Sequence, residues 1–326
     1  MLVLEGSPPM ARVSRSRGLR TSLSEEPRSA VTGISPFLQC ALLMAVSLIV
    51  GWQSLLRTFT LALHADEYTH LLLIVPISLS LILTERDRLK PQPGIGLGAA
   101  LLLIAILTAC YSRCMPTAQS DTQLSISMLA IAFWWIGSFV FCFGARAARL
   151  FLFPLCFLFW IIPIPQPVLN QLIAFWQHGS ALCASMLFSA FGIPVTQDGI
   201  VISIPGLTLE VAQECSSLRS SLMLIVTSMV LAHLFLRSFW RKTAVVVAAI
   251  PLSIAKNGLR IFTIAMLGTR VDPGFLHGNL HRHGGIVFFL AALLAVLLLL
   301  WLLNRGEHLP EHSHRQKPTS VTQHIG

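Results

Sequence analysis

Long apolar runs separated by short polar segments repeat along most of the chain. Eight runs are candidates for helices that cross a bilayer, at residues 37–56, 71–83, 97–111, 125–143, 150–162, 216–236, 243–266 and 286–303. A helix needs about 20 apolar residues to cross the hydrocarbon core, so the two short runs, 71–83 and 150–162, must extend into their polar flanks or meet a thinner bilayer. The pattern predicts an all-α integral membrane protein with about eight transmembrane helices.

The segment 168–191 is amphipathic rather than uniformly apolar. Leucine, isoleucine and tryptophan recur at helical spacing on one side, at Leu169, Leu172, Ile173 and Trp176. The other side is polar, with Asn170, Gln171, Gln177 and His178. Such a helix either crosses the membrane or lies flat on the outer surface with its apolar side in lipid. Because crossing would bring Gln177 and His178 near mid-membrane, we expect an interfacial helix.

A strand-like stretch follows this segment. Residues 200–204 and 207–211 are rich in β-branched and aliphatic residues and flank the pair Pro205 and Gly206. Asp198 and Gly199 mark a turn before them. Apolar runs around such a turn predict a short extracytoplasmic β-hairpin, which delivers the chain to the next helix.

Composition excludes a water-soluble fold. Only 11% of the residues are charged and 54% are hydrophobic, whereas a soluble domain carries about 25% charged residues. The net charge of +9 does not indicate a nucleic-acid partner, because a basic binding face needs a polar surface that this composition cannot supply. The basic residues fit better in the loops and tails of a membrane protein.

The distribution of basic residues predicts the orientation. Residues 1–35 are rich in Ser, Arg and Pro and predict a disordered cytoplasmic tail. Residues 36–304 form the multi-pass membrane domain, and residues 305–326 form a second cytoplasmic tail. In the first half of the chain, basic residues concentrate on the side of the N-terminal tail, and only Arg57 and Arg113 lie opposite. The N-terminus is therefore expected inside, although six basic residues against five leave the second half undecided.

Three polar clusters lie at the ends of predicted membrane helices. They cover residues 213–221, residues 256–260 and residues 277–283. Charged groups cost about 2.5–3.5 kcal/mol each at the centre of a membrane helix, so they usually have a function or a partner. Because the helices that carry the clusters alternate in direction, the three clusters are expected to meet at one face of the membrane.

The first cluster combines a thiol with a guanidinium group. Cys215 and Arg219 are four residues apart and share one side of a helix near its start. A thiol at a helix N-terminus beside guanidinium groups forms the nucleophilic thiolate more readily, although Glu214 opposes this effect. A histidine would complete a nucleophile and base pair, and an arginine would stabilise an oxyanion. These groups indicate acyl transfer through a thioester.

The same residues are also compatible with non-catalytic roles. Arg219, Lys256 and Arg260 could reach lipid headgroups as long flexible side chains. The histidine-rich third cluster has only Asp272 as a nearby carboxylate, which makes zinc a poor fit, so we expect no metal and no cofactor. A transporter or polysaccharide-export component that binds an anionic solute would use the same cations. A purely structural membrane subunit is the third class.

Three ordered motifs resemble those of the exosortase/archaeosortase family. They are residues 214–220 around Cys215, residues 257–261 around Arg260, and residues 281–289, which begin at His281. Shorter stretches also agree with the family, at residues 66–76, 163–167 and 192–195. The resemblance covers about residues 37–303.

The resemblance implies a membrane cysteine peptidase or transpeptidase of the bacterial inner membrane. Members cleave exported proteins that end in a sorting signal: a Pro-Glu-Pro-type motif, a membrane helix and a basic cluster. They often accompany exopolysaccharide production. Because such substrates are cut after export, the active site is expected on the extracytoplasmic side, in contact with membrane lipid. The oligomeric state stays open.

The resemblance also assigns roles to individual residues. The catalytic Cys, Arg and His of the family fall on Cys215, Arg260 and His281, since His281 has the family's spacing to Gly285. His277 and His283 remain alternatives for the base. Supporting or substrate-binding roles are expected for Arg219, Asn257, Ser216 and His283. Ser217 stands where the family commonly has Gly, which would admit a closer approach of backbone and substrate.

Overall fold

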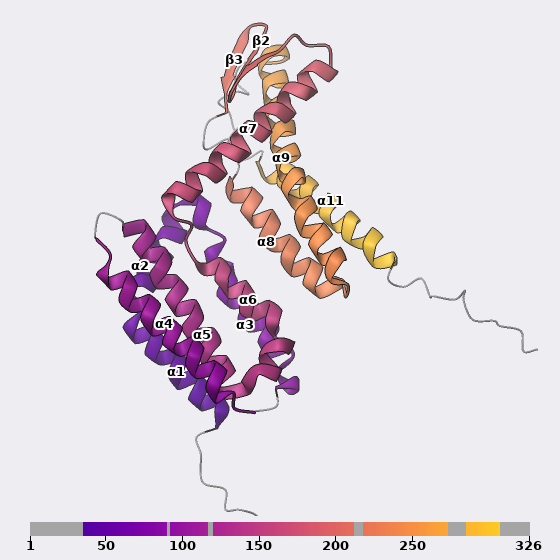
Figure 1. Cartoon of the computed structure of the whole chain (residues 1–326). Helices are drawn as coiled ribbons and strands as arrows, with labels where there is room; N and C mark the ends of the chain where they lie inside the picture. Colours follow the sequence, from indigo (N-terminus) through magenta and orange to yellow (C-terminus); the bar gives the residue numbers. More distant parts are fainter. Residues whose placement is uncertain (1–34, 90–91, 117–119, 212–217, 273–284, 307–326) are drawn as a thin grey trace, which may run out of the picture. The chain divides into compact units, whose positions relative to one another are not determined.

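The computed structural model describes residues 35–89, 92–116, 120–211, 218–272 and 285–306. The chain divides into two units, Met1–Ser35 and Pro36–Gly326. All the described helices and strands lie in the second unit (Figure 1).

Helices make up nearly all of the described structure. They are α1 (Pro36–Val50), α2 (Trp52–His64), α3 (Leu71–Thr84), α4 (Ile95–Cys114), α5 (Ser120–Leu150), α6 (Leu152–Phe157), α7 (Gln166–Ala190), α8 (Leu218–Phe235), α9 (Phe239–Arg270) and α11 (Gly285–Arg305). Short 3-10 turns are η1 (Asp66–Tyr68), η2 (Arg86–Arg88) and η4 (Leu158–Ile161). The described residues contain six helices long and apolar enough to cross a membrane, or up to eight if each of two bent pairs counts as a span. The predicted all-α membrane class is confirmed.

The first predicted span is broken rather than continuous. Instead of one helix over residues 37–56, α1 and α2 meet at Gly51 with a bend of 76°. A Cβ atom at Gly51 would lie 2.7 Å from the Ser47 carbonyl oxygen and 2.8 Å from the Ile131 side chain. Because only glycine fits this close contact, the chain turns where the apolar pattern alone predicts that it continues.

A second bend separates α6 and η4 from α7. The two parts are inclined by 98°, and the break contains Pro163 and Pro165. Proline lacks the backbone N–H that a helix interior needs. The helix therefore stops at η4 and starts again in a new direction at Gln166.

Helices α1, α2 and α4 pack around α5, while α3 packs against α6 and η4. The pair α4 and α5 shares the most extensive contact, since Gly98 of α4 lets the backbone of Phe141 approach to 2.5 Å from where a Cβ atom would lie. The indole Nε1 of Trp135 donates to Ser47 Oγ at 2.8 Å and ties α5 to α1. Buried Phe139 and Phe151 extend this core.

The later helices α8, α9 and α11 form a second packed group. Their common core is aliphatic, with fully or nearly fully buried Leu224, Val245 and Val296. Arg241 Nη1, near the start of α9, donates to the Leu303 carbonyl oxygen, near the end of α11, at 2.8 Å. The start of α9 and the end of α11 therefore lie together.

Helix α7 runs parallel to the second half of α9. Trp176 Nε1 donates to Ser253 Oγ at 2.9 Å, and the rings of Phe188 and Phe262 lie 5.0 Å apart further along both helices. The predicted helix is confirmed, but its predicted surroundings are wrong. Leu169, Ile173 and Trp176 are buried against other helices instead of facing lipid, because an apolar helix face packs equally well against protein.

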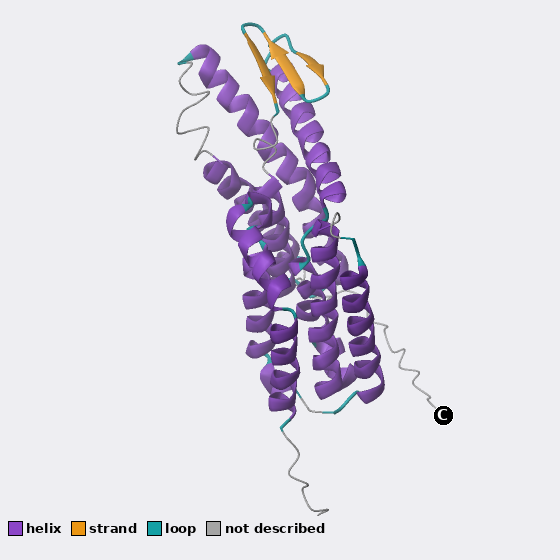
Figure 2. Cartoon of the chain, turned by 90° about the vertical axis from the view of Figure 1, so that its left-hand side faces the viewer, coloured by secondary structure: helices purple, strands orange, loops and turns teal. Residues whose placement is uncertain are grey.

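A three-stranded antiparallel sheet covers the ends of α7 and α9 (Figure 2). Its strands are β1 (Thr196–Asp198), β2 (Val201–Ile204) and β3 (Leu207–Glu210). The predicted hairpin is β2 and β3, joined through Gly206 at a φ of 85°, while β1 adds a strand that the sequence did not predict. Fully buried Ile202 packs the sheet onto Phe188 of α7 and Ala265 of α9.

Both ends of the segment that contains α7 and the sheet lie at the same turn, η1. Tyr68 donates its hydroxyl to the Ile164 carbonyl oxygen at 2.8 Å, just before α7 begins. Beyond the sheet, Arg219 of α8 contacts Asp66 of η1. Since the chain leaves from and returns to one turn, α7 does not carry it across the bundle.

Candidate functional site

The first described turn of α8 holds Arg219 and Ser220. Cys215 stands three positions before Leu218, where the description of α8 begins. Residues 212–217 are outside the described part of the chain, and so are Cys215 and Ser216 within them. The groups that surround the start of α8 are therefore the described part of the candidate site.

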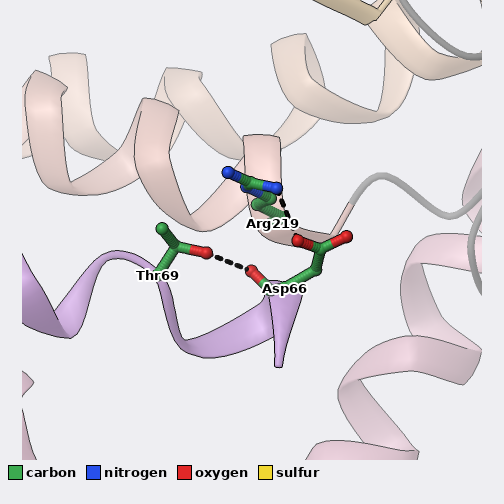
Figure 3. A network of polar contacts seen from close by, with 3 residues as sticks. All are labelled: Asp66, Thr69 and Arg219. Carbon is green, nitrogen blue, oxygen red and sulfur yellow. Dashed lines mark hydrogen bonds and ion pairs between the residues drawn. The ribbon is translucent and has the colours of Figure 1, made fainter. Parts of the chain in front are cut away.

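An ion pair joins this turn to η1 (Figure 3). Arg219 Nη1 donates to Asp66 Oδ1 at 2.5 Å, and Thr69 Oγ1 donates to the Asp66 carbonyl oxygen at 2.8 Å. The side chains of Arg219 and Asp66 are 52% and 79% exposed. A pair this exposed contributes no more than about 1 kcal/mol to folding stability. The ion pair with Asp66 instead fixes the orientation of the Arg219 guanidinium group.

The turn η1, which carries Asp66, is fixed by contacts of its neighbours Tyr68 and His70. Beside the Tyr68 contact with Ile164, His70 is buried at 3% exposure and its Nδ1 lies 3.0 Å from the Glu67 carbonyl oxygen. The His70 ring meets the Trp160 ring edge to face at 6.4 Å. Asp66 thus projects from a packed turn rather than from a loose loop.

Lys256 of α9 is a buried cation beside the same turn. Only 6% of the residue is exposed, and its Nζ donates to Ser220 Oγ. The ion pairs within the described residues are Glu85 with Arg88 and Asp66 with Arg219, so no described carboxylate neutralises Lys256. An unneutralised charge inside a membrane helix is costly, which makes Lys256 a candidate functional residue.

Helix α9 presents different residues to its two neighbours. Asn257 is fully buried and its Nδ2 donates to Ser180 Oγ of α7 at 2.9 Å. Arg260 lies one turn beyond Lys256 and therefore shares the side of α9 that meets α8. Together, the start of α8 and this side of α9 carry three positive charges: Arg219, Lys256 and Arg260.

The structure describes three of the residues expected in the site, Arg219, Asn257 and Arg260. It brings the first two polar clusters together, because Lys256 of the second contacts Ser220 of the first. The expected residues Cys215, Ser216, His281 and His283, and the alternative base His277, lie outside the described residues. Their roles, like those of Arg219, Asn257 and Arg260, stay predictions.

Asp66 and Lys256 are neighbours of this site to which the sequence pattern assigns no individual catalytic or binding role, although Lys256 belongs to the second polar cluster and Asp66 to a stretch that resembles the family. One signal for Asp66 was available: the chain has only 14 Asp and Glu, and Asp66 and Glu67 form an acidic pair shortly before an apolar run. No local sequence pattern predicts that Asp66 pairs with Arg219, which is 153 positions away. For Lys256 the signal was a charge within an apolar run, which a headgroup contact accounts for equally well.

The described residues contain no group of three or more His, Cys, Asp or Glu placed to hold a metal ion. The positive charges at α8 and α9 instead favour anionic groups, including an oxyanion formed on a carbonyl carbon. These positive charges can stabilise negative charge beside the segment that contains Cys215.

Comparison with known families agrees with the arrangement. A family model described as transmembrane exosortase matches residues 52–298 of the 326-residue chain, from α2 into α11. The search of curated proteins and the search of solved structures gave no match. The matched region contains Asp66, Arg219, Lys256 and Arg260. Because the match covers well over half of its length, the chain belongs to the transmembrane exosortase family.

Proposed function

We propose that the protein is a membrane-embedded cysteine peptidase or transpeptidase that cleaves the C-terminal sorting signals of exported proteins. Family membership supports a membrane transpeptidase or protease that acts on sorting signals. One observation supports the finer proposal: buried Lys256 contacts the first described turn of α8, beside Arg219 and a few residues after Cys215.

The proposed reaction begins with the Cys215 thiol. His281 takes the thiol proton, and the thiolate forms a C–S bond to the scissile carbonyl carbon. The carbonyl oxygen becomes an oxyanion, which Arg260 stabilises. Lys256 and Arg219 add positive potential, and Asn257 and Ser216 support the site. The cations thus act where negative charge develops.

Collapse of the tetrahedral intermediate completes the first half. The C–N bond breaks, and the imidazolium of His281 gives its proton to the leaving amine. The amine product carries the membrane helix and basic tail of the signal. Water or an acceptor amine then attacks the thioester while His281 takes its proton, and the Cys215 thiolate leaves and takes this proton back from His281. Hydrolysis and transpeptidation differ only in this second nucleophile.

We place the site on the extracytoplasmic side of a bacterial inner membrane. Helix α9 has 32 residues and is about 48 Å long, which exceeds the hydrocarbon core of about 30 Å. Basic residues at its start, Arg241 and Lys242, favour the cytoplasmic side for that end. The opposite end, with the sheet, then extends outward toward exported substrates.

Co-expression with a reporter tests the proposal. The reporter is an exported protein that ends in a Pro-Glu-Pro motif, an apolar helix and a basic cluster, and its size is followed by immunoblot. With the Cys215→Ala variant, uncleaved reporter should accumulate while the variant itself reaches normal membrane abundance. The matched control is Cys156→Ala, which removes an exposed thiol of α6 and should leave cleavage unchanged.

The same assay separates the competing classes. Full activity of Cys215→Ser or Cys215→Ala would overturn the peptidase proposal and favour an anion-binding transporter or export component. Equal tolerance of Arg260→Lys and His281→Gln would point to a structural subunit. Loss of cleavage in all four variants, with membrane abundance maintained, is the expected result.

A further inference from the structure

A cavity of about 330 Å³ lies between the bend of α1 and α2 and the helices α4 and α5. Its volume is within the range of small-molecule sites. Asp66, Arg219, Lys256 and Arg260 do not line it. The cavity is therefore separate from the candidate peptidase site, and binding in it can be tested without the proposed reaction.

The charged residues that line the cavity are two arginines. Arg57 projects from α2 and Arg113 from the last turn of α4, and no Asp or Glu is among the lining residues. Within the described part of the chain, neither guanidinium group has a hydrogen bond or an ion pair. Two like charges facing one space favour an anionic occupant.

Along α4 and α5, the lining of the cavity changes from mostly polar to apolar, and α1 and α2 add the polar residues Ser47, Gln53 and Ser54. Near Arg113, the lining is polar and includes Ser112, Gln123 and Ser127. Further along, the lining is apolar, with Ala105 and Ile106 of α4 and with Ala130, Ile131 and Trp134 of α5. Ala105 and Arg113 are eight residues apart on one helix, or about 12 Å. The cavity thus has a cationic end and an apolar end.

The hydroxyl, amide and indole groups that α4 and α5 contribute to the cavity already have protein partners. Ser112 Oγ and Ser127 Oγ lie 2.6 Å apart, and Gln123 Nε2 donates to the Ser112 carbonyl oxygen at 3.1 Å. Trp134 Nε1 donates to the Leu43 carbonyl oxygen at 2.7 Å. The donors that remain for a ligand are Gln53 and Ser54 of α2 and the two guanidinium groups, and the guanidinium groups are the strongest of them because they are charged.

The apolar end opens on a surface that faces lipid. Val46 and Val50 of α1 and Ile106 of α4 line the cavity and are 44%, 61% and 47% exposed. In a transmembrane family, exposed aliphatic side chains on such helices contact acyl chains. An acyl chain can therefore enter from the side without crossing polar protein.

We propose that this cavity binds one anionic phospholipid from the leaflet at the α4–α5 connection. Arg57 and Arg113 hold the phosphate, since guanidinium groups match its geometry, and an acyl chain lies against Ala105, Ile131 and Trp134. Free phosphate would leave the apolar end unfilled. The basic end of a sorting signal would be repelled by both arginines.

Lipid retention by the purified full-length protein tests the site. Delipidated protein in detergent is titrated with phosphatidylglycerol, phosphatidylcholine or inorganic phosphate, and bound species are counted by native mass spectrometry. We expect at least tenfold tighter retention of phosphatidylglycerol than of phosphatidylcholine, and no competition by phosphate. The double variant Arg57→Gln/Arg113→Gln should reduce phosphatidylglycerol retention to the level of phosphatidylcholine.

Two further variants make the result specific. Arg146→Gln/Arg149→Gln removes two arginines at the other end of α5 and should leave retention unchanged. Ala109→Phe fills the cavity, keeps both arginines, and should lower phosphatidylglycerol retention at least tenfold with unchanged helical circular dichroism. The proposal is overturned by equal retention of both lipids, by equal losses in the two arginine pairs, or by displacement of phosphatidylglycerol by a sorting-signal peptide.

Discussion

Lys256 is a charged residue in the interior of a membrane helix, and its ammonium group lies close to the start of α8. Its ammonium group contacts Ser220 in the first described turn of α8, next to the segment that carries the proposed nucleophile. At an effective dielectric constant of about 20, a unit charge still interacts with another over several ångströms by a few kcal/mol. Positive potential of this size favours a thiolate and an oxyanion over their neutral forms.

Replacement of Lys256 by Met tests this effect. The variant keeps the length of the side chain and removes the charge, so cleavage of the reporter should fall at least tenfold, equivalent to about 1.4 kcal/mol. The folded protein should be no less stable, because a buried charge has been removed. Reporter cleavage and thermal unfolding in detergent measure the two effects.

Lys242→Met provides the matched control, since it removes a lysine from the opposite end of the same helix. It should leave cleavage unchanged. Wild-type cleavage by Lys256→Met would show that the charge of Lys256 does not contribute to the reaction.

Individual elements were predictable where the information is local. Apolar runs predicted the helices, and the residues around Gly206 predicted β2 and β3. The bend at Gly51 was not predictable, because it depends on contact with Ile131 of a distant helix. The protein-facing side of α7 and the pairing of Asp66 with Arg219 depend in the same way on which helices become neighbours. The site was therefore predictable as residue types, but not as a set of contacts.

The contact between α7 and α9 depends on a glycine. A Cβ atom at Gly258 would lie 2.6 Å from both Cβ and Sγ of Cys183, so Gly258→Ala forces the two helices apart. We expect a loss of about 1–3 kcal/mol in stability, measured as a lower unfolding midpoint. Cleavage should also fall, because neighbouring Asn257 and Arg260 move with α9.

A double variant and a control make this specific. Cys183→Gly removes both clashing atoms and should restore part of the loss, as a double-mutant cycle would show. Gly96→Ala of α4, where a Cβ atom meets nothing within 4 Å, should leave the unfolding midpoint unchanged or raise it. Equal effects of Gly96→Ala and Gly258→Ala would contradict the close packing of α7 on α9.

At the scale of the whole molecule, long-range contacts support the proposed orientation of the second half, which charge counting left undecided. Arg219 meets Asp66 at one end of α3, while η2, with Arg86 and Arg88, follows the other end. The start of α8 is therefore opposite η2. The loop after α8, which carries Arg237, then lies on the side of η2, and the contact of Arg241 with Leu303 brings the end of α11 there too. One side collects the basic loops, as expected for a cytoplasmic face.

Epitope insertion tests this orientation in cells. An epitope after Gly199, in the turn between β1 and β2, should bind antibody in intact spheroplasts, because the sheet lies with the end of α9 opposite the basic loops. The same epitope in η2, after Asp87, should bind only after permeabilisation, because Arg86 and Arg88 hold that turn inside. Both insertions must keep reporter cleavage, so that the folded enzyme is being measured. A protected epitope after Gly199 would place the candidate site in the cytoplasm, where a substrate cut after export never arrives, and would contradict the proposed function as well as the orientation.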